Sequence, residues 1–108
     1  MLEVLARLHA SDPSVADLYH EDAVRYGHDG VVMRGRVEIR AFYESLFPRT
    51  PPLPEIRALF AHGPFVGALI RLPGSADPPY EYVDLFEVES GLVRSIRVLQ
   101  PKAIHSRR

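Results

Sequence analysis

The stretch Tyr80–Leu99 constrains the fold more than any other part of this chain of 108 residues. Its first half, Tyr80–Val88, distributes side chains to two faces with a period of two, which is typical of a β-strand. Glu89–Gly91 then supplies turn residues, and Leu92–Gln100 has the pattern of a second strand. The sequence therefore predicts a long β-hairpin.

One carboxylate lies on the more apolar face of this hairpin. The alternation places Asp84 with Tyr82, Phe86 and Val88, while the glutamates of the strand point the other way. A carboxylate among aromatic side chains must be paired, hydrogen-bonded or raised in pKa. An acid with a raised pKa works near neutral pH, so Asp84 is the first candidate for a catalytic residue that acts on a substrate oxygen.

The loop between the two strands decides what Asp84 faces. We expect a three-residue loop with Gly91 in the left-handed conformation, which places Asp84 opposite Ile96 and close to Val98. The pKa of Asp84 is then expected to lie above its reference of about 4. A two-residue turn would instead place Arg97 opposite Asp84 and make the carboxylate an ordinary ion-paired residue.

His28 is the second catalytic candidate. It follows a predicted strand, in the turn Gly27–Gly30. A histidine titrates near neutral pH and can act as a general base, whereas the alternative is an exposed turn residue. Asp84 also has an alternative, because it could be a structural carboxylate bonded to Tyr19, Tyr43 or a backbone amide.

Aromatic and aliphatic side chains are expected to line a pocket near Asp84, although aromatic residues at such spacings can also belong to the core. The expected ligand-binding residues are Tyr19, Tyr26, Tyr43, Tyr82, Phe86, Ile96 and Val98. Arg71 is unusual on an apolar strand. It either shares a pocket-facing row with Phe65 and Leu69 and binds an anion, or reaches solvent at the strand end.

The rest of the chain has helical patterns first and strand patterns later. Helices are predicted over Met1–His9, from Ser11 or Asp12 to about Glu21, and over Arg36–Phe47. Strands are predicted over Ala23–Tyr26, Val31–Met33, Glu55–Ala61 and Phe65–Leu72, before the hairpin. The prolines of Pro48–Pro54 predict an extended connection. This order of elements predicts an α+β fold with an antiparallel sheet.

Two apolar surfaces are expected to be covered. In the third predicted helix, an apolar stripe should pack on the sheet and close the pocket floor; its members are Ile39, Phe42 and Leu46. The outer face of the hairpin has Val83 and Leu85 at its centre. Its surroundings are Glu81, Glu87 and Arg97, with Val93, Ser95 and Leu99 across from them. An apolar centre with a charged rim predicts a homodimer through this outer sheet face.

The composition argues against several classes of function. The formal net charge is −1, so we expect no nucleic-acid or membrane partner. The absence of cysteine excludes disulfides and thiolate chemistry, and the five histidines have no metal-ligand spacing. No nucleotide-binding or serine-hydrolase motif is present. We expect one cytoplasmic domain over residues 1–108, with no metal and no cofactor.

Three phrases of the sequence, in this order and spacing, resemble the NTF2-like superfamily. They are Leu18–Val24, Arg34–Tyr43, and Val83–Val88 with Gly91 and Ser95–Arg97. The resemblance is strongest to the branch of SnoaL-like and ketosteroid-isomerase-like proteins. It implies a cone, in which a curved antiparallel sheet wraps on N-terminal helices around a closed apolar pocket.

The resemblance also assigns some residues. Asp84 aligns with the protonated aspartic acid of ketosteroid isomerase, and Tyr19 and Tyr43 fall where that family has supporting tyrosines. The aspartate base of that family falls at Gly27, or at Tyr26 or His28 if the gap is shifted, and its oxyanion tyrosine falls near Glu3 or Val4, so neither is present. The resemblance therefore implies a related pocket without the complete steroid isomerase machinery.

Two functions fit these expectations. The first is a cofactor-independent isomerase or cyclase that acts on a small apolar carbonyl compound, with Asp84 as acid and His28 as base. The second is a non-catalytic module that holds a small apolar ligand or docks a protein partner.

Overall fold

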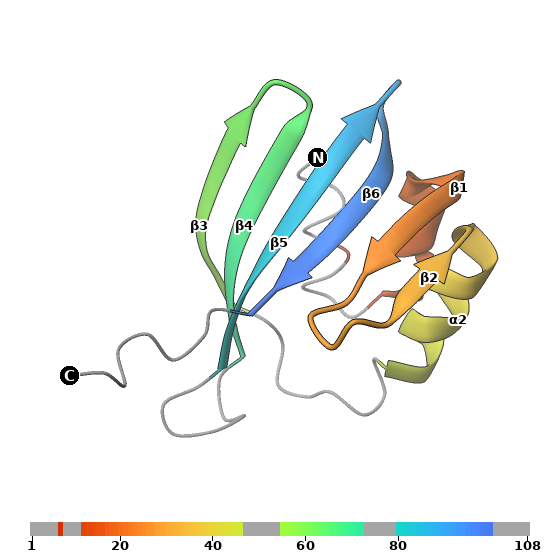
Figure 1. Ribbon diagram of the computed structural model, residues 1–108, viewed down its shortest axis with the longest axis horizontal. Coiled ribbons are helices and arrows are strands. Elements are labelled where there is room, and N and C mark those ends of the chain that lie inside the picture. Colours follow the sequence, from red (N-terminus) through yellow and green to blue (C-terminus); the bar gives the residue numbers. More distant parts are fainter. Residues whose placement is uncertain (1–6, 8–11, 47–54, 73–79, 101–108) are drawn as a thin grey trace.

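The computed structural model describes residues 7, 12–46, 55–72 and 80–100 (Figure 1). They form a 3-10 helix, η1 (Pro13–Leu18), one α-helix, α2 (Arg36–Leu46), and six strands. The strands are β1 (Tyr19–Tyr26), β2 (Val32–Arg34), β3 (Glu55–His62), β4 (Phe65–Leu72), β5 (Tyr80–Glu89) and β6 (Leu92–Leu99). Apart from Arg7, the predicted helix Met1–His9 lies outside the described residues, as does the connection Pro48–Pro54.

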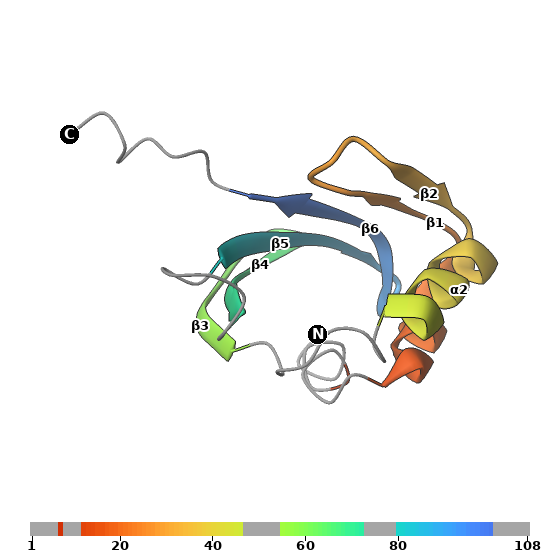
Figure 2. The ribbon, with the colours of Figure 1, turned by 90° about the horizontal axis from the view of Figure 1, so that it is seen from below.

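The six strands form one curved sheet in the order β2-β1-β6-β5-β4-β3. Strands β3 to β6 pair as the expected antiparallel meander. β1 pairs antiparallel with β2 but parallel with β6, so the sheet is mixed and the prediction of a wholly antiparallel sheet is wrong. Figure 2 shows the curvature, with η1 and α2 on the concave side near β1.

The second predicted helix is shorter than expected. It is the 3-10 helix η1, and β1 already begins at Tyr19, whereas the sequence predicted helix as far as Glu21. Two contacts explain the early end. Arg36 donates to the Tyr19 carbonyl oxygen from Nε at 2.9 Å and from Nη2 at 2.6 Å. Tyr19 also pairs with Val93 of β6, and both contacts fix it in extended backbone.

The turn between β5 and β6 has two residues, so the predicted three-residue loop is wrong. Glu89 pairs with Leu92, which leaves Ser90 and Gly91 as the loop. Both loop residues have positive φ, 53° for Ser90 and 79° for Gly91. This is the type I′ geometry, whose twist matches that of the flanking strands.

A bulge in β6 nevertheless keeps Asp84 away from Arg97. The register shifts by one residue beyond Val88, and Arg94 is the extra residue in β6. A two-residue turn alone would pair Asp84 with Arg97. Since a shift of one residue exchanges the faces of a strand, the bulge pairs Asp84 with Val98 instead. The apolar environment expected for the Asp84 carboxylate is therefore present, but it results from the bulge and not from a three-residue loop.

The core lies on the concave face, between the sheet and the two helices. Its buried residues are Val15, Tyr19, Ala23, Ile39, Tyr43, Ala68, Ile70, Phe86, Val93, Ile96 and Val98. Val93 was expected on the outer face, and the bulge that follows it explains the difference. In α2, Ile39 and Tyr43 are buried, whereas Phe42 and Leu46 of the predicted stripe are only half-buried.

The type I′ turn can be tested by two substitutions. Ser90→Asn should raise the free energy of unfolding by about 0.5 kcal/mol, because Asn tolerates positive φ better than Ser. Gly91→Ala should lower it by about 1 kcal/mol, because an added Cβ is strained at that φ. Urea unfolding at an unchanged m-value measures both. A loss of stability in Ser90→Asn would contradict this turn geometry.

Candidate functional site

Asp84 lies on the concave face of β5, in the middle of the sheet. Its partners across the sheet are Ala68 of β4 and Val98 of β6, both with small side chains. Tyr82 and Phe86 flank it along the same face of β5. Asp84 keeps some accessible surface, yet protein atoms desolvate its carboxylate. This combination indicates a carboxylate that opens toward the inside of the curved sheet and not toward bulk water.

Burial raises the pKa of Asp84 from its ordinary value of 3.8 to about 6, and the Arg25 guanidinium opposes this rise. Among the described residues, no cation forms an ion pair with Asp84. The predicted increase in pKa is therefore confirmed. Near pH 6 about half of these carboxyl groups carry a proton and can donate it.

Two buried tyrosines lie on the same side of the sheet. The hydroxyl oxygens of Tyr19 and Tyr43 are 3.0 Å apart, and the rings meet edge to face with centroids 6.4 Å apart. Burial raises the pKa of both hydroxyls, and the charge of Asp84 adds to the rise. Both therefore remain protonated donors. In the described part of the chain, neither hydroxyl is hydrogen-bonded to Asp84. This differs from the alternative in which Asp84 is a structural carboxylate bonded to one of these tyrosines.

Arg25 is the residue near Asp84 that sequence reasoning missed. It pairs with Ile96 in β6, so its side chain belongs to the concave face. Its guanidinium carbon lies 4.1 Å from the centroid of the Phe42 ring. The positive charge lowers the pKa of the nearby Tyr43 hydroxyl, against the effect of burial. A weak signal existed in the sequence, because Arg25 alternates with two small residues, Ala23 and Gly27.

His28 lies at the rim of the concave face. Its ring meets Tyr82 edge to face, with centroids 5.1 Å apart. His28 is exposed, as its alternative interpretation held. A hollow of about 330 Å³ lies beside it at the ends of β1 and β6; its lining residues are Tyr26, Gly27, His28, Arg97, Val98, Leu99 and Gln100. This hollow includes the strand partner of Asp84, Val98. The closed internal pocket stays a prediction.

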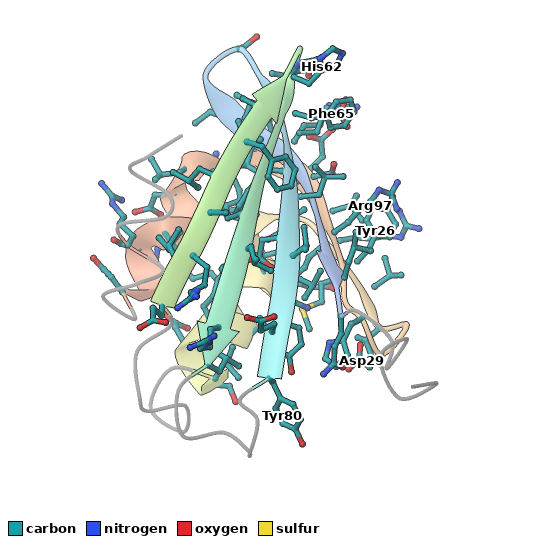
Figure 3. All side chains as sticks on the ribbon, turned by 90° about the vertical axis from the view of Figure 1, so that its left-hand side faces the viewer. Tyr26, Asp29, His62, Phe65, Tyr80 and Arg97 are labelled. Atoms are coloured by element: carbon teal, nitrogen blue, oxygen red, sulfur yellow. The ribbon has the colours of Figure 1, made fainter. Side chains whose placement is uncertain are left out.

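Tyr26, a predicted pocket residue, and Arg71, whose alternative was a residue that reaches solvent, both lie on the convex face. Tyr26 pairs with Arg97, whose guanidinium carbon is 4.2 Å from the Tyr26 ring centroid. Figure 3 shows both projecting from the side of the sheet that faces away from the helices. Arg71 lies 3.6 Å from Glu81 and 3.9 Å from Glu55 on the same face. The row of Arg71 therefore points away from the pocket side, and its guanidinium is an ion-paired surface group.

Within the residues that the structure describes, no three His, Cys, Asp or Glu side chains are grouped so as to hold a metal ion. No helix in those ranges is both long and apolar enough to cross a membrane.

Comparison with known proteins now identifies the family. The family model of the SnoaL-like domain matches residues 2–96. The chain belongs to the SnoaL-like family. No curated protein is significantly similar to this SnoaL-like chain in sequence.

Solved structures share its NTF2-like fold. An NTF2-like protein of Cytophaga hutchinsonii superposes with a TM-score of 0.74 at 18% identity, over 93% of this chain and 85% of that one. A protein of Kribbella flavida assigned as a ketosteroid isomerase gives 0.75 at 22% identity, over 91% and 72%. A protein of Jannaschia sp. assigned as a SnoaL-like polyketide cyclase gives 0.75 at 19% identity, over 92% and 83%. At these identities, the likeness shows the fold alone.

The raised pKa of Asp84 predicts a pH-dependent stability. The groups that surround it are Arg25 and Tyr19 of β1 and Tyr43 of α2. The carboxyl is neutral in folded and unfolded chains below pH 4, so stability should fall as pH rises from about 4 to 6. Asp84→Asn removes this cost. At pH 7 the variant should exceed the wild type by at most about 3 kcal/mol in free energy of unfolding.

Asp12→Asn provides the matched control. Asp12 accepts a hydrogen bond from the Ser14 backbone N–H at 3.0 Å, and this bond holds its pKa below the usual value. Its contribution to stability is therefore lost only as the pH falls through the acid range below about 4. Denaturant titrations of each variant at pH 4, 5, 6 and 7 separate the two patterns. An Asp84→Asn curve parallel to that of the wild type would contradict the raised pKa.

Proposed function

We propose that this SnoaL-like domain binds a small carbonyl compound on its concave face and catalyses an acid–base isomerisation or cyclisation. The observation that carries the proposal is a carboxyl with a pKa of about 6 among apolar side chains. Such a group can donate a hydrogen bond or a proton to a substrate oxygen near neutral pH. The fold is shared with structures assigned as an isomerase and as a cyclase, which supports this class of reaction.

The proposed reaction has a simple proton balance. A base removes a proton from the carbon next to the carbonyl, the electron pair moves to the carbonyl oxygen, and Asp84 donates its proton there. The protonated base then gives its proton to a different carbon, while the enol O–H returns its proton to the Asp84 carboxylate, which completes an isomerisation and restores both groups. His28 is the proposed base, at the rim and against Tyr82.

The surrounding side chains have a binding role in this proposal. Phe86, Ile96 and Val98 provide apolar contact beside Asp84 and limit the access of water. Tyr82 covers the route from His28 to the carboxylate, and the buried tyrosine pair supports the opposite end. Tyr26 can reach a ligand only through the hollow at the rim, because its strand position faces outward.

One observation favours the second function, a non-catalytic binding module. His28 is exposed, and in the described part of the structure its ring contact is with Tyr82. A base that does not approach the acid would leave a pocket that binds a carbonyl compound without converting it. Turnover and binding must therefore be measured on the same compound. One domain over residues 1–108 and a cytoplasmic location belong to both versions of the proposal.

The catalytic proposal predicts isomerisation of a simple probe, 3-cyclohexen-1-one, to its conjugated isomer, followed by ultraviolet absorbance. The wild type should accelerate this reaction above the buffer rate. Asp84→Asn should lower the rate by about tenfold to hundredfold and Asp84→Leu by more, because Leu cannot donate to oxygen. Arg94→Gln, at the hairpin tip, should have no effect. Binding of the probe without turnover would select the binding module, and absence of both would contradict the proposal.

We also propose that two copies pair through the convex sheet face. Val83 and Leu85 lie half-buried at its centre. Leu99 is 50% exposed, Phe65 is 41% exposed, and Phe60, which lies over Gly67, is 54% exposed. Charged residues border this area, including Glu81 and Arg71. Exposed apolar groups with a charged border are typical of an interface.

The dimer predicts a specific effect of Val83→Arg. A charge at the centre of a self-complementary interface is introduced twice and should convert a dimer into monomers. Val37→Arg is the control, because Val37 is 83% exposed on α2, and that helix lies on the concave side of the sheet (Figure 2). Sedimentation velocity at micromolar concentration measures both. A wild type that sediments only as a monomer would remove the proposal.

A further inference from the structure

Arg25 is a half-buried cation whose guanidinium is hydrogen-bonded to the Tyr43 hydroxyl and interacts at longer range with Asp84 and Asp29. Its Nε is buried without a hydrogen-bond partner, and no described carboxylate forms an ion pair with it. The Nε of Arg71 also has no hydrogen bond, but Arg71 forms ion pairs with two glutamates on the convex face, and Arg40 lies 2.9 Å from Asp17. A buried donor without an acceptor is costly, so a further acceptor is expected beside the Nε of Arg25.

The guanidinium lies along β1 toward the rim of the concave face, near enough to Asp84 to lower the pKa of that carboxyl. Nη1 of Arg25 lies only 3.2 Å from where a Cβ of Gly27 would be, so the side chain leans along β1 over a residue that has none. The face of the guanidinium lies on the Phe42 ring, which fixes its plane. Gly27 and Val98 both border the hollow at the rim. The neighbour of Arg25 in its row and the strand partner of Asp84 therefore border the same hollow.

We propose that Arg25 binds the carboxylate of the ligand, so that the site takes a small carbonyl compound that carries a carboxylate at one end. The inference rests on the proposed function for the ligand's carbonyl group, which Asp84 receives. A guanidinium matches the two oxygens of a carboxylate with two parallel N–H donors. β1 and β5 are separated only by β6, so their backbones are about 10 Å apart. A ligand with its two oxygen groups a few carbons apart therefore fits between the two residues.

A carboxylate on the ligand also explains why the site contains both a carboxyl group, Asp84, and a cation, Arg25. Arg25 fixes the anionic end of the ligand on β1, and the apolar residues of β6 contact its middle. The carbonyl end then meets the proton of Asp84. Without a cation on this face, a carboxylate ligand would be repelled by the ionised fraction of Asp84. Arg25 thus determines which end of the ligand approaches the acid.

The test uses two probes of equal shape, phenylacetate and its neutral amide, phenylacetamide, with the full chain. Binding is measured by changes in the protein's amide NMR signals. The wild type should bind phenylacetate about tenfold to hundredfold more tightly than phenylacetamide, the range expected of hydrogen bonds to a charged group. Arg25→Met, which keeps the stem over Phe42, should abolish this preference. Arg94→Met, an exposed arginine of β6, should retain it.

A second variant keeps the inference testable if Arg25→Met does not fold. Arg25→Lys retains the charge but loses the planar pair of donors, and should reduce the preference without removing it. Equal binding of the two probes by the wild type, or no binding of phenylacetate at millimolar concentration, would overturn the inference. Asp84→Asn should keep the preference for phenylacetate. Failure of the isomerisation assay with the preference intact would therefore count against the reaction and not against Arg25.

Discussion

The arrangement on the concave face depends on one extra residue in β6. A type I′ turn sets the register of the hairpin, and Arg94 shifts it by one before the strands reach the middle of the sheet. Because side chains alternate between faces, this shift decides whether Arg97 or Val98 is opposite Asp84. It sends Arg97 to the convex face, where it stacks on Tyr26, and leaves the carboxylate among apolar neighbours.

Because these neighbours are apolar, ionisation of Asp84 is unfavourable, and the nearby charge of Arg25 offsets this only in part. Arg25 lowers the pKa of the carboxyl but does not pair with it. The tyrosine pair is held by burial and by Arg36, which fixes the Tyr19 carbonyl from the helix side. A group kept near its titration point is unfavourable for stability and useful for proton transfer. This is the physical basis on which the proposed chemistry stands.

Local patterns in the sequence predicted the hairpin, the helix after Gly35 and the face on which Asp84 lies, because these depend on neighbours within one or two strands. Three features depended on distant contacts. Nothing local marks Arg94 as a bulge, and the parallel pairing of β1 with β6 joins opposite ends of the chain. Arg36 ends η1 from another element.

Arg25 escaped sequence reasoning for a related reason. The pairing between β1 and β6 is irregular between Tyr19 and Val24, so the register that brings Arg25 beside Ile96 cannot be counted from the sequence. The pattern Tyr26, then His28, suggested a pocket row, whereas the row of Ala23, Arg25 and Gly27 faces inward. In the sequence, the small residues Ala23 and Gly27 on either side of Arg25 indicated that a large side chain lies between them on that face.

The central claim is that the interior of this SnoaL-like domain holds a carboxyl that titrates near neutral pH. The most direct measurement is a carbon-13 NMR titration of the Asp84 side-chain carboxyl in the free protein, assigned by comparison with Asp84→Asn. The account predicts a midpoint near pH 6. A midpoint at or below pH 4, the range of an ordinary or ion-paired aspartate, would contradict it.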